Sequence, residues 1–114
     1  MPAKKIARSQ IAVTTAAAGS TAADAGVLPS SRSVYPVSGA DDTKGVIIAQ
    51  GDAWLGNQIH ICNLVSNKIL KIYPPTGGTI NGAAANAAVS SPRGIGVHLI
   101  CLAATATGGT WAAF

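Results

Sequence analysis

Short runs of β-branched and aliphatic residues alternate with clusters of Gly, Pro, Asn and Ser along the second half of the chain. Short apolar runs with turn residues between them at regular spacing are typical of β-sandwiches and β-barrels. No stretch of this half repeats with the period of a helix. The pattern predicts an all-β fold, a β-sandwich or jelly-roll-like module over residues 45–114, with strands at 45–50, 57–65, 69–73, 87–90, 95–103 and 110–114.

Residues 1–44 have little periodicity and are rich in Ala, Ser, Thr, Gly and Asp. The alanines of residues 14–25 favour a helix, but the threonines, Gly19 and Ser20 among them weaken that preference. A short strand is expected at residues 34–37, and Pro36 within it indicates the edge of a sheet. We therefore predict an extended N-terminal arm and irregular segment over residues 1–44.

Alternation within the run at residues 69–73 assigns its faces. Leu70 and Ile72 share one face, and Lys71 and Tyr73 share the other, because successive side chains of a strand point to opposite sides. We expect Leu70 and Ile72 to lie in the core.

The loop that follows, with the sequence YPPTGGTING at residues 73–82, has the glycines of a phosphate-binding loop but not its other features. A phosphate-binding loop of the Walker type needs a lysine and a following helix. Neither is present, and Pro74 and Pro75 remove two N–H donors. Two turns, at residues 75–78 and at Asn81-Gly82, fit the sequence better.

A chain of 114 residues makes one domain, and much of its 48% hydrophobic content is alanine, with only 4% aromatic residues. Such a core is thin, so contacts between subunits are expected to add stability. Eight Lys and Arg residues against four Asp and no Glu give a net charge of +4. Three of the cations, Lys4, Lys5 and Arg8, lie in the arm, which suits an acidic protein surface or nucleic acid. They are the candidate contacts to a partner.

Neither an export signal nor a membrane span is expected. The stretch at residues 11–21 is too polar for the hydrophobic part of a signal peptide. No run reaches the ~18 apolar residues that a transmembrane helix needs.

Four residues of types that bind zinc occur in two predicted strands: His60, Cys62, His98 and Cys101. His60 and Cys62 share a face, whereas His98 and Cys101, three residues apart, face opposite ways. We therefore expect no metal site. Both cysteines lie in apolar strands and are expected to be free thiols.

Catalytic chemistry is not expected either. The four aspartates all fall in predicted loops, and no nucleophile motif or spaced carboxylate pair is present. Asp41 and Asp42 are adjacent, so they cannot face each other across a substrate. Weak calcium binding at residues 41–45 is an alternative, but a solvated turn is favoured. The sequence predicts a protein that is not an enzyme and needs no cofactor.

The two tryptophans, Trp54 and Trp111, lie beside loops without a cluster of cations. A barrel that binds single-stranded nucleic acid interleaves aromatic and basic residues, so nucleic-acid binding is the weakest alternative. Both tryptophans are expected to fill a core or a subunit seam, and they are the candidate oligomer or surface contacts. A receptor- or glycan-binding module of a virion spike or tail is the second alternative, with Trp54, Asp52 and Asn57 as its best site.

A series of motifs runs through residues 45–114. It comprises Gly45-Val46-Ile47-Ile48, Asn63, the LKIYPPTGGTING segment at 70–82, Ala85-Asn86-Ala87-Ala88-Val89, a glycine-led strand from Gly94 to Cys101, and Gly109-Thr110-Trp111. This order resembles small bacteriophage virion proteins of the head-decoration (cement) family. The motifs are turns and core positions, so the resemblance indicates the fold more firmly than the function.

The resemblance implies a structural protein on the capsid exterior, made in the host cytoplasm. It implies that the module decorates and stabilises the capsid by binding the major capsid protein. It also implies a symmetric homo-oligomer, with a homotrimer as first choice and a homodimer as second, and no membrane or direct nucleic-acid contact.

Overall fold

The computed structural model describes residues 10–91, 96–105 and 107–114. Lys4, Lys5 and Arg8, the candidate partner contacts of the arm, lie outside the described residues.

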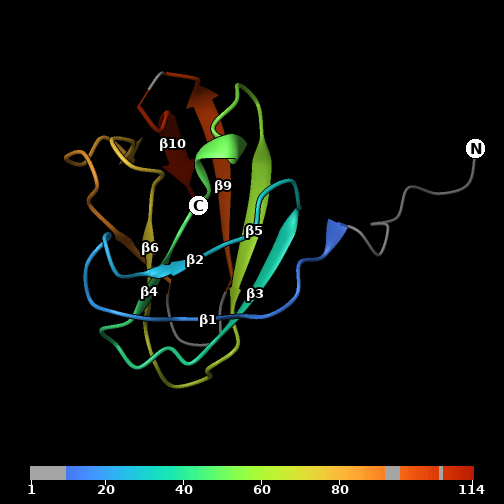
Figure 1. Ribbon diagram of the computed structural model, residues 1–114, viewed down its shortest axis with the longest axis vertical. Coiled ribbons are helices and arrows are strands. Elements are labelled where there is room, and N and C mark those ends of the chain that lie inside the picture. The colour runs from blue at the N-terminus through green and yellow to red at the C-terminus, as the bar shows by residue number, and fades with distance from the viewer. Residues whose placement is uncertain (1–9, 92–95, 106) are drawn as a thin grey trace, which may run out of the picture.

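The described chain forms a β-sandwich of two curled sheets (Figure 1). The six-stranded sheet has the order β1-β3-β5-β9-β10-β7, and the four-stranded sheet has the order β2-β4-β6-β8. A single turn of 3₁₀ helix, η2 (Gln50–Asp52), precedes β5. The strands are β1 (Thr15–Ala16), β2 (Gly26–Val27), β3 (Val34–Ser38), β4 (Gly45–Ile47), β5 (Gln58–Asn63), β6 (Leu70–Tyr73), β7 (Thr79–Ile80), β8 (Val89–Ser91), β9 (Gly96–Ala103) and β10 (Thr110–Ala113). The predicted all-β sandwich is confirmed.

Consecutive strands from β1 to β9 lie in opposite sheets. Most strands that neighbour each other in a sheet are therefore two apart in sequence, the exceptions being β5–β9, β9–β10 and β10–β7. Four of the pairs that are two apart are parallel: β1 with β3, β3 with β5, β2 with β4 and β4 with β6. Parallel neighbours usually require a helical crossover. In this chain the crossover is a strand of the other sheet.

The expected boundary at residue 44 is wrong for the described part of the chain. β1, β2 and β3 all precede residue 44, yet they lie in the same two sheets as the later strands. Leu28, Tyr35 and Val37 are buried in the shared core. The periodicity of this segment is weak because its strands are two to five residues long and hold their place by backbone pairing.

Pro36 does not mark a sheet edge, because β3 lies between β1 and β5. The N-terminal segment pairs with β3 irregularly: Ile11 lies opposite Val34, and Thr15 lies opposite Val37. The segment thus has one more residue than β3 over this stretch. Pro36 falls at this irregularity, where a regular ladder hydrogen bond is not required, so its missing N–H costs little.

The core confirms the predicted faces of β6. Leu70 and Ile72 are fully buried, and Lys71 is half-exposed on the opposite side. Tyr73 is buried as well, because the loop after β1 covers it and its hydroxyl donates to Ser20 O at 3.0 Å.

Trp111 is 1% exposed, and its Nε1 donates to Gly108 O at 2.8 Å. Trp111 is therefore a core residue, which is one of the two places expected for it, and it is not exposed as a surface contact.

The YPPTGG segment is a bend between the sheets, as predicted. It connects β6 of the smaller sheet to β7 of the larger one. Gly78 N donates to Pro75 O at 2.8 Å, which closes the first turn. The second turn has positive φ at Asn81 (54°) and Gly82 (74°), with Ala83 N donating to Ile80 O. Asn-Gly is the pair that such a turn favours, because both residues tolerate this backbone conformation.

Replacing Leu70 by alanine should lower the free energy of unfolding by about 2–5 kcal/mol, as truncation of a buried leucine does. Lys71→Ala, on the other face of the same strand, should change it by about 0.5 kcal/mol or less. Urea denaturation of both variants checks the assignment, and a larger loss for Lys71→Ala than for Leu70→Ala would contradict it.

Candidate functional site

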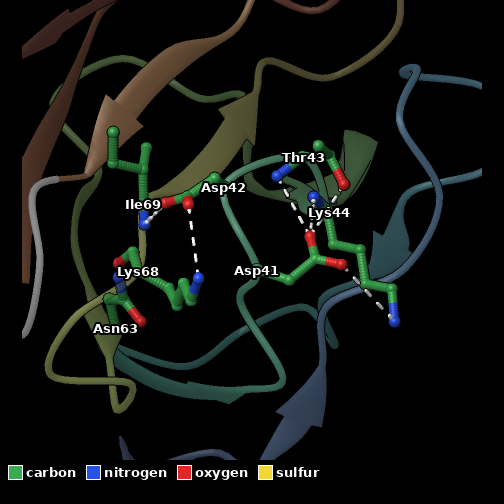
Figure 2. Close-up of polar contacts among 7 residues, drawn as sticks. All are labelled: Asp41, Asp42, Thr43, Lys44, Asn63, Lys68 and Ile69. Atoms are coloured by element: carbon green, nitrogen blue, oxygen red, sulfur yellow. Dashed lines mark hydrogen bonds and ion pairs between the residues drawn. The ribbon is translucent and has the colours of Figure 1, made fainter.

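The paired aspartates at residues 41 and 42 are bonded into their own loops (Figure 2). Asp41 Oδ1 accepts from Thr43 N, Thr43 Oγ1 and Lys44 N at 3.0, 2.7 and 2.9 Å. The bonds from Thr43, followed by that from Lys44, lower the pKa of Asp41 to about 2. Asp42 accepts from Ile69 N at 2.7 Å and lies 3.6 Å from Lys68 Nζ. These carboxylates close turns and join the β3–β4 loop to the loop before β6.

This arrangement favours the turn interpretation over weak calcium binding. The two carboxylates point to different partners in Figure 2 rather than toward one centre. Within the described residues, no group of three or more His, Cys, Asp or Glu side chains could hold a metal ion.

His60 and His98 lie opposite each other on β5 and β9. Their rings stack with centroids 4.4 Å apart and planes 18° from parallel. His98 Nε2 lies 3.1 Å from Gln58 Oε1. Burial, and then the charge of His98, lower the pKa of His60. The neutral form of His60 is therefore favoured.

The two cysteines occupy opposite sides of the larger sheet. Cys62 is half-buried on the outer face that also carries His60, whereas Cys101 is fully buried in the core. The predicted faces of all four zinc-type residues are confirmed: His60, Cys62 and His98 point outward, and Cys101 points inward. Both cysteines are free, as predicted.

The outer face of the six-stranded sheet carries no Asp, Glu, Lys or Arg on its central strands β3, β5, β9 and β10. A row of side chains crosses the sheet here, because Ile11 pairs with Val34, Val34 with His60 and His60 with His98. Phe114 extends the row, with its ring centroid 5.8 Å from that of His98. We call this surface the uncharged face; it consists of Ile11, Val34, Pro36, Gln58, His60, Cys62, His98, Ile100, Leu102, Ala112 and Phe114.

Solvent reaches much of the uncharged face. Leu102 is 53% exposed and Phe114 is 74% exposed. A sheet face in contact with water normally alternates polar residues with the buried ones. Contiguous exposed apolar surface of this kind marks an interaction site, and the cores of protein interfaces are likewise depleted of charged residues.

A second feature is a polar hollow of about 290 Å³ beside Trp54. It lies where the loop between β2 and β3 meets the loop between η2 and β5. Trp54 is 56% exposed, so its ring is available to a ligand. The hollow is lined by Gln10, Ser31, Arg32, Ser33, Asp52, Trp54 and Asn57. The three residues proposed from sequence for a glycan site are thus brought together, but Gln10 and Arg32 were missed because they come from distant segments.

Asp52 differs from the role expected of it. Its side chain is 1% exposed; Oδ1 accepts from Ser31 N and Oδ2 from the Tyr35 hydroxyl, each at 2.8 Å. Burial, and then the bond to Asp52, raise the pKa of Tyr35 well above its ordinary value. Asp52 therefore holds the two loops in place rather than presenting a charge to solvent.

Two larger hollows have fewer side chains that could bind a ligand or react. One of about 550 Å³ lies between the loops at residues 20–23 and 73–86, and one of about 350 Å³ lies near β8 and Phe114. Neither is lined by a charged residue, a histidine or a cysteine.

Comparisons of the chain with protein-family models, with curated proteins and with solved structures give no match. Among the described residues, no helix has the length and apolar character needed to cross a membrane.

Alkylation under non-reducing conditions should label Cys62 in the folded protein and both cysteines after denaturation. Cys101 should react only on unfolding, because it is fully buried and burial raises the pKa of its thiol, which lowers the thiolate fraction. Mass spectrometry counts the labels. A pair that stays unlabelled after denaturation would reveal a disulfide.

Tyr35→Phe should lower the free energy of unfolding by about 1–3 kcal/mol, because it leaves Oδ2 of the buried Asp52 carboxylate without its donor. Tyr73→Phe is the matched control, since the Tyr73 hydroxyl donates only to the neutral Ser20 carbonyl. Its loss should be nearer 1 kcal/mol. Thermal denaturation compares the two, and equal losses would mean that the Asp52 bond has no special weight.

Proposed function

We propose that this chain is a structural virion protein that decorates and stabilises a bacteriophage capsid. It binds the major capsid protein through the uncharged face of its larger sheet. The observation that carries the proposal is this face, which combines exposed apolar side chains with an absence of ionised groups across β3, β5, β9 and β10. The resemblance of residues 45–114 to head-decoration proteins supplies the kind of partner.

The uncharged face suits a protein partner because little has to be desolvated when it is covered. Burying an ionised side chain without a partner is costly, whereas apolar area contributes roughly 25 cal/mol per Å² buried. The stacked His60–His98 pair adds a flat aromatic centre, and the lowered pKa of His60 favours its neutral form there. Phe114, whose ring centroid lies 5.8 Å from that of His98, adds an aromatic side chain of a type that is enriched in protein interfaces.

The use of the aspartates supports a role without catalysis or a cofactor. Each of the four carboxylates accepts hydrogen bonds from backbone N–H groups of its own or a neighbouring loop. The chain has no glutamate. Its carboxylates therefore stabilise the loops through hydrogen bonds.

The basic arm adds a second contact in this proposal. Lys4, Lys5 and Arg8 meet acidic residues of the capsid, and linking two contacts raises the effective concentration of each. The module acts as a homo-oligomer, a homotrimer as first choice and a homodimer as second. Its site of action is the capsid exterior.

Co-sedimentation with purified capsids that lack this protein tests the proposal. Leu102→Lys places a charge on an exposed apolar part of the contact and should weaken binding at least tenfold, or about 1.4 kcal/mol. Val27→Lys is the matched control, because Val27 is 70% exposed but lies on the smaller sheet. It should bind as the parent protein does.

Two further measurements complete the test: the salt dependence of binding and the temperature of genome release. Replacing Lys4, Lys5 and Arg8 by alanine should weaken binding chiefly at low salt, because exposed charges are screened beyond ~10 Å at 0.1 M ionic strength. Decorated capsids should release their genome at a higher temperature than undecorated ones. Full binding by Leu102→Lys, or no binding by the parent protein, would refute the proposal.

A further inference from the structure

We propose that the hollow beside Trp54 is a carbohydrate site that takes one neutral pyranose ring of a surface glycan. This inference rests on the loops around η2 and not on the uncharged face, so it holds or fails independently of capsid binding.

Trp54 provides the platform. Its ring is 56% exposed, yet its backbone is held on both sides: Trp54 N donates to Asp52 O, and Asn57 N donates to Trp54 O, each at 3.0 Å. Gly56 N donates to Cys101 O at 2.8 Å, which ties the same loop to β9. A tryptophan side chain has only two rotatable bonds, so on a held backbone it loses little conformational freedom on binding. The C–H face of a pyranose ring is the apolar surface that would pack on it.

Polar groups surround the platform and retain hydrogen-bonding capacity. Arg32 Nη1 donates to Ser31 O at 3.2 Å, but its guanidinium forms no ion pair with any described carboxylate. Gln10 Oε1 accepts from Ser33 Oγ at 2.7 Å, and no described residue accepts from the amide nitrogen of Gln10. Asn57 Nδ2 donates to Asp52 O, and within the described chain its Oδ1 has no donor. Donors and an acceptor thus remain for the hydroxyl groups of a sugar.

The loop that carries Arg32 is preorganised. Asp52 accepts from Ser31 N, and the Tyr35 hydroxyl accepts from Arg32 N at 3.1 Å. Ser31 adopts a φ of 65°, a conformation that costs energy for a residue with a side chain. Such strain persists where surrounding bonds enforce it and is common at binding sites. Asp52 is the positioning residue that joins both walls of the hollow.

Charge and size indicate the class of ligand. Arg32 and Asp52 are the charged residues among those that line the hollow, so their formal charges cancel. A neutral ligand fits this balance better than an acidic sugar or a phosphate. The volume of about 290 Å³ lies at the lower end of the ~300–1,000 Å³ typical of small-molecule sites. This suits a single ring rather than a buried oligosaccharide.

Nuclear magnetic resonance of the ¹⁵N-labelled full chain tests the proposal, because the chain has two tryptophans and only Trp54 is exposed. The probes are the methyl glycosides of glucose, galactose and mannose, and N-acetylglucosamine, with glucuronate as the charged comparison. Each is titrated to about 50 mM, which detects dissociation constants in the millimolar range. At least one neutral sugar should shift the Trp54 indole signal saturably and leave the Trp111 signal unchanged.

Substitutions identify which side chains bind the sugar. Trp54→Ala should abolish binding, and Arg32→Gln should weaken it at least fivefold. Leu55→Ala is the control, since Leu55 is 68% exposed and adjacent to the platform but does not line the hollow; it should bind normally. The buried Trp111 signal reports whether each variant stays folded. The proposal fails if no neutral sugar shifts Trp54, if Trp54→Ala still binds, or if glucuronate binds more tightly than every neutral sugar.

Discussion

The passage of the chain from one sheet to the other after nearly every strand is the constraint on which the rest of the structure depends. It allows the neighbours β1, β3 and β5 of one sheet, and β2, β4 and β6 of the other, to be parallel without helices, because each return to the sheet is made through a strand of the opposite sheet. It places a bend between the sheets after each strand from β1 to β8, and these bends contain residues that tolerate positive φ, among them Gly39, Gly77 and Gly82. It also brings Ala18, just after β1, into a two-way backbone pairing with Gly45 of β4, which links the two sheets at one side.

Bends of this kind need hydrogen bonds that hold their loops in place, and the few acidic residues of the chain accept these bonds. Asp24 and Asp41 cap their own turns, and Asp52 and Asp42 each join two loops that are distant in sequence. A carboxylate that accepts several N–H bonds offsets the loss of backbone freedom in a loop that has few apolar contacts. The result is a surface on which ionised groups gather around the loops, while the outer side of the larger sheet carries none on its central strands.

Sequence reasoning succeeded where a run was long enough to show its own period. β5, β6, β9 and β10 were placed to within two residues at each end, and the inward faces of Leu70 and Ile72 and the two turns of the YPPTGG bend were correct. It failed for β1, β2 and β7, which are two residues long and are defined by their partners rather than by their side chains. For the same reason the boundary at residue 44 was misplaced. Only some of the residues that line the hollow beside Trp54 were predicted. Gln10 and Arg32 were missed because they come from segments distant in sequence, and a local sequence pattern does not show which distant segments pair.

The order of strands also decides when this chain can fold as it leaves the ribosome. β5 pairs on one side with β3, which is already synthesised, and on the other with β9, which emerges some forty residues later. β9 in turn depends on β10 at the very end of the chain, as does β7. Because a ribosome adds roughly 5–20 residues per second, the apolar sides of β3 and β5 wait for seconds before their sheet is complete. Pairing of such distant segments is intrinsically slow, so the larger sheet is complete only after β10 has been synthesised. Throughout that interval its strands depend on their short length and on the intervening glycines and prolines to avoid pairing with other chains.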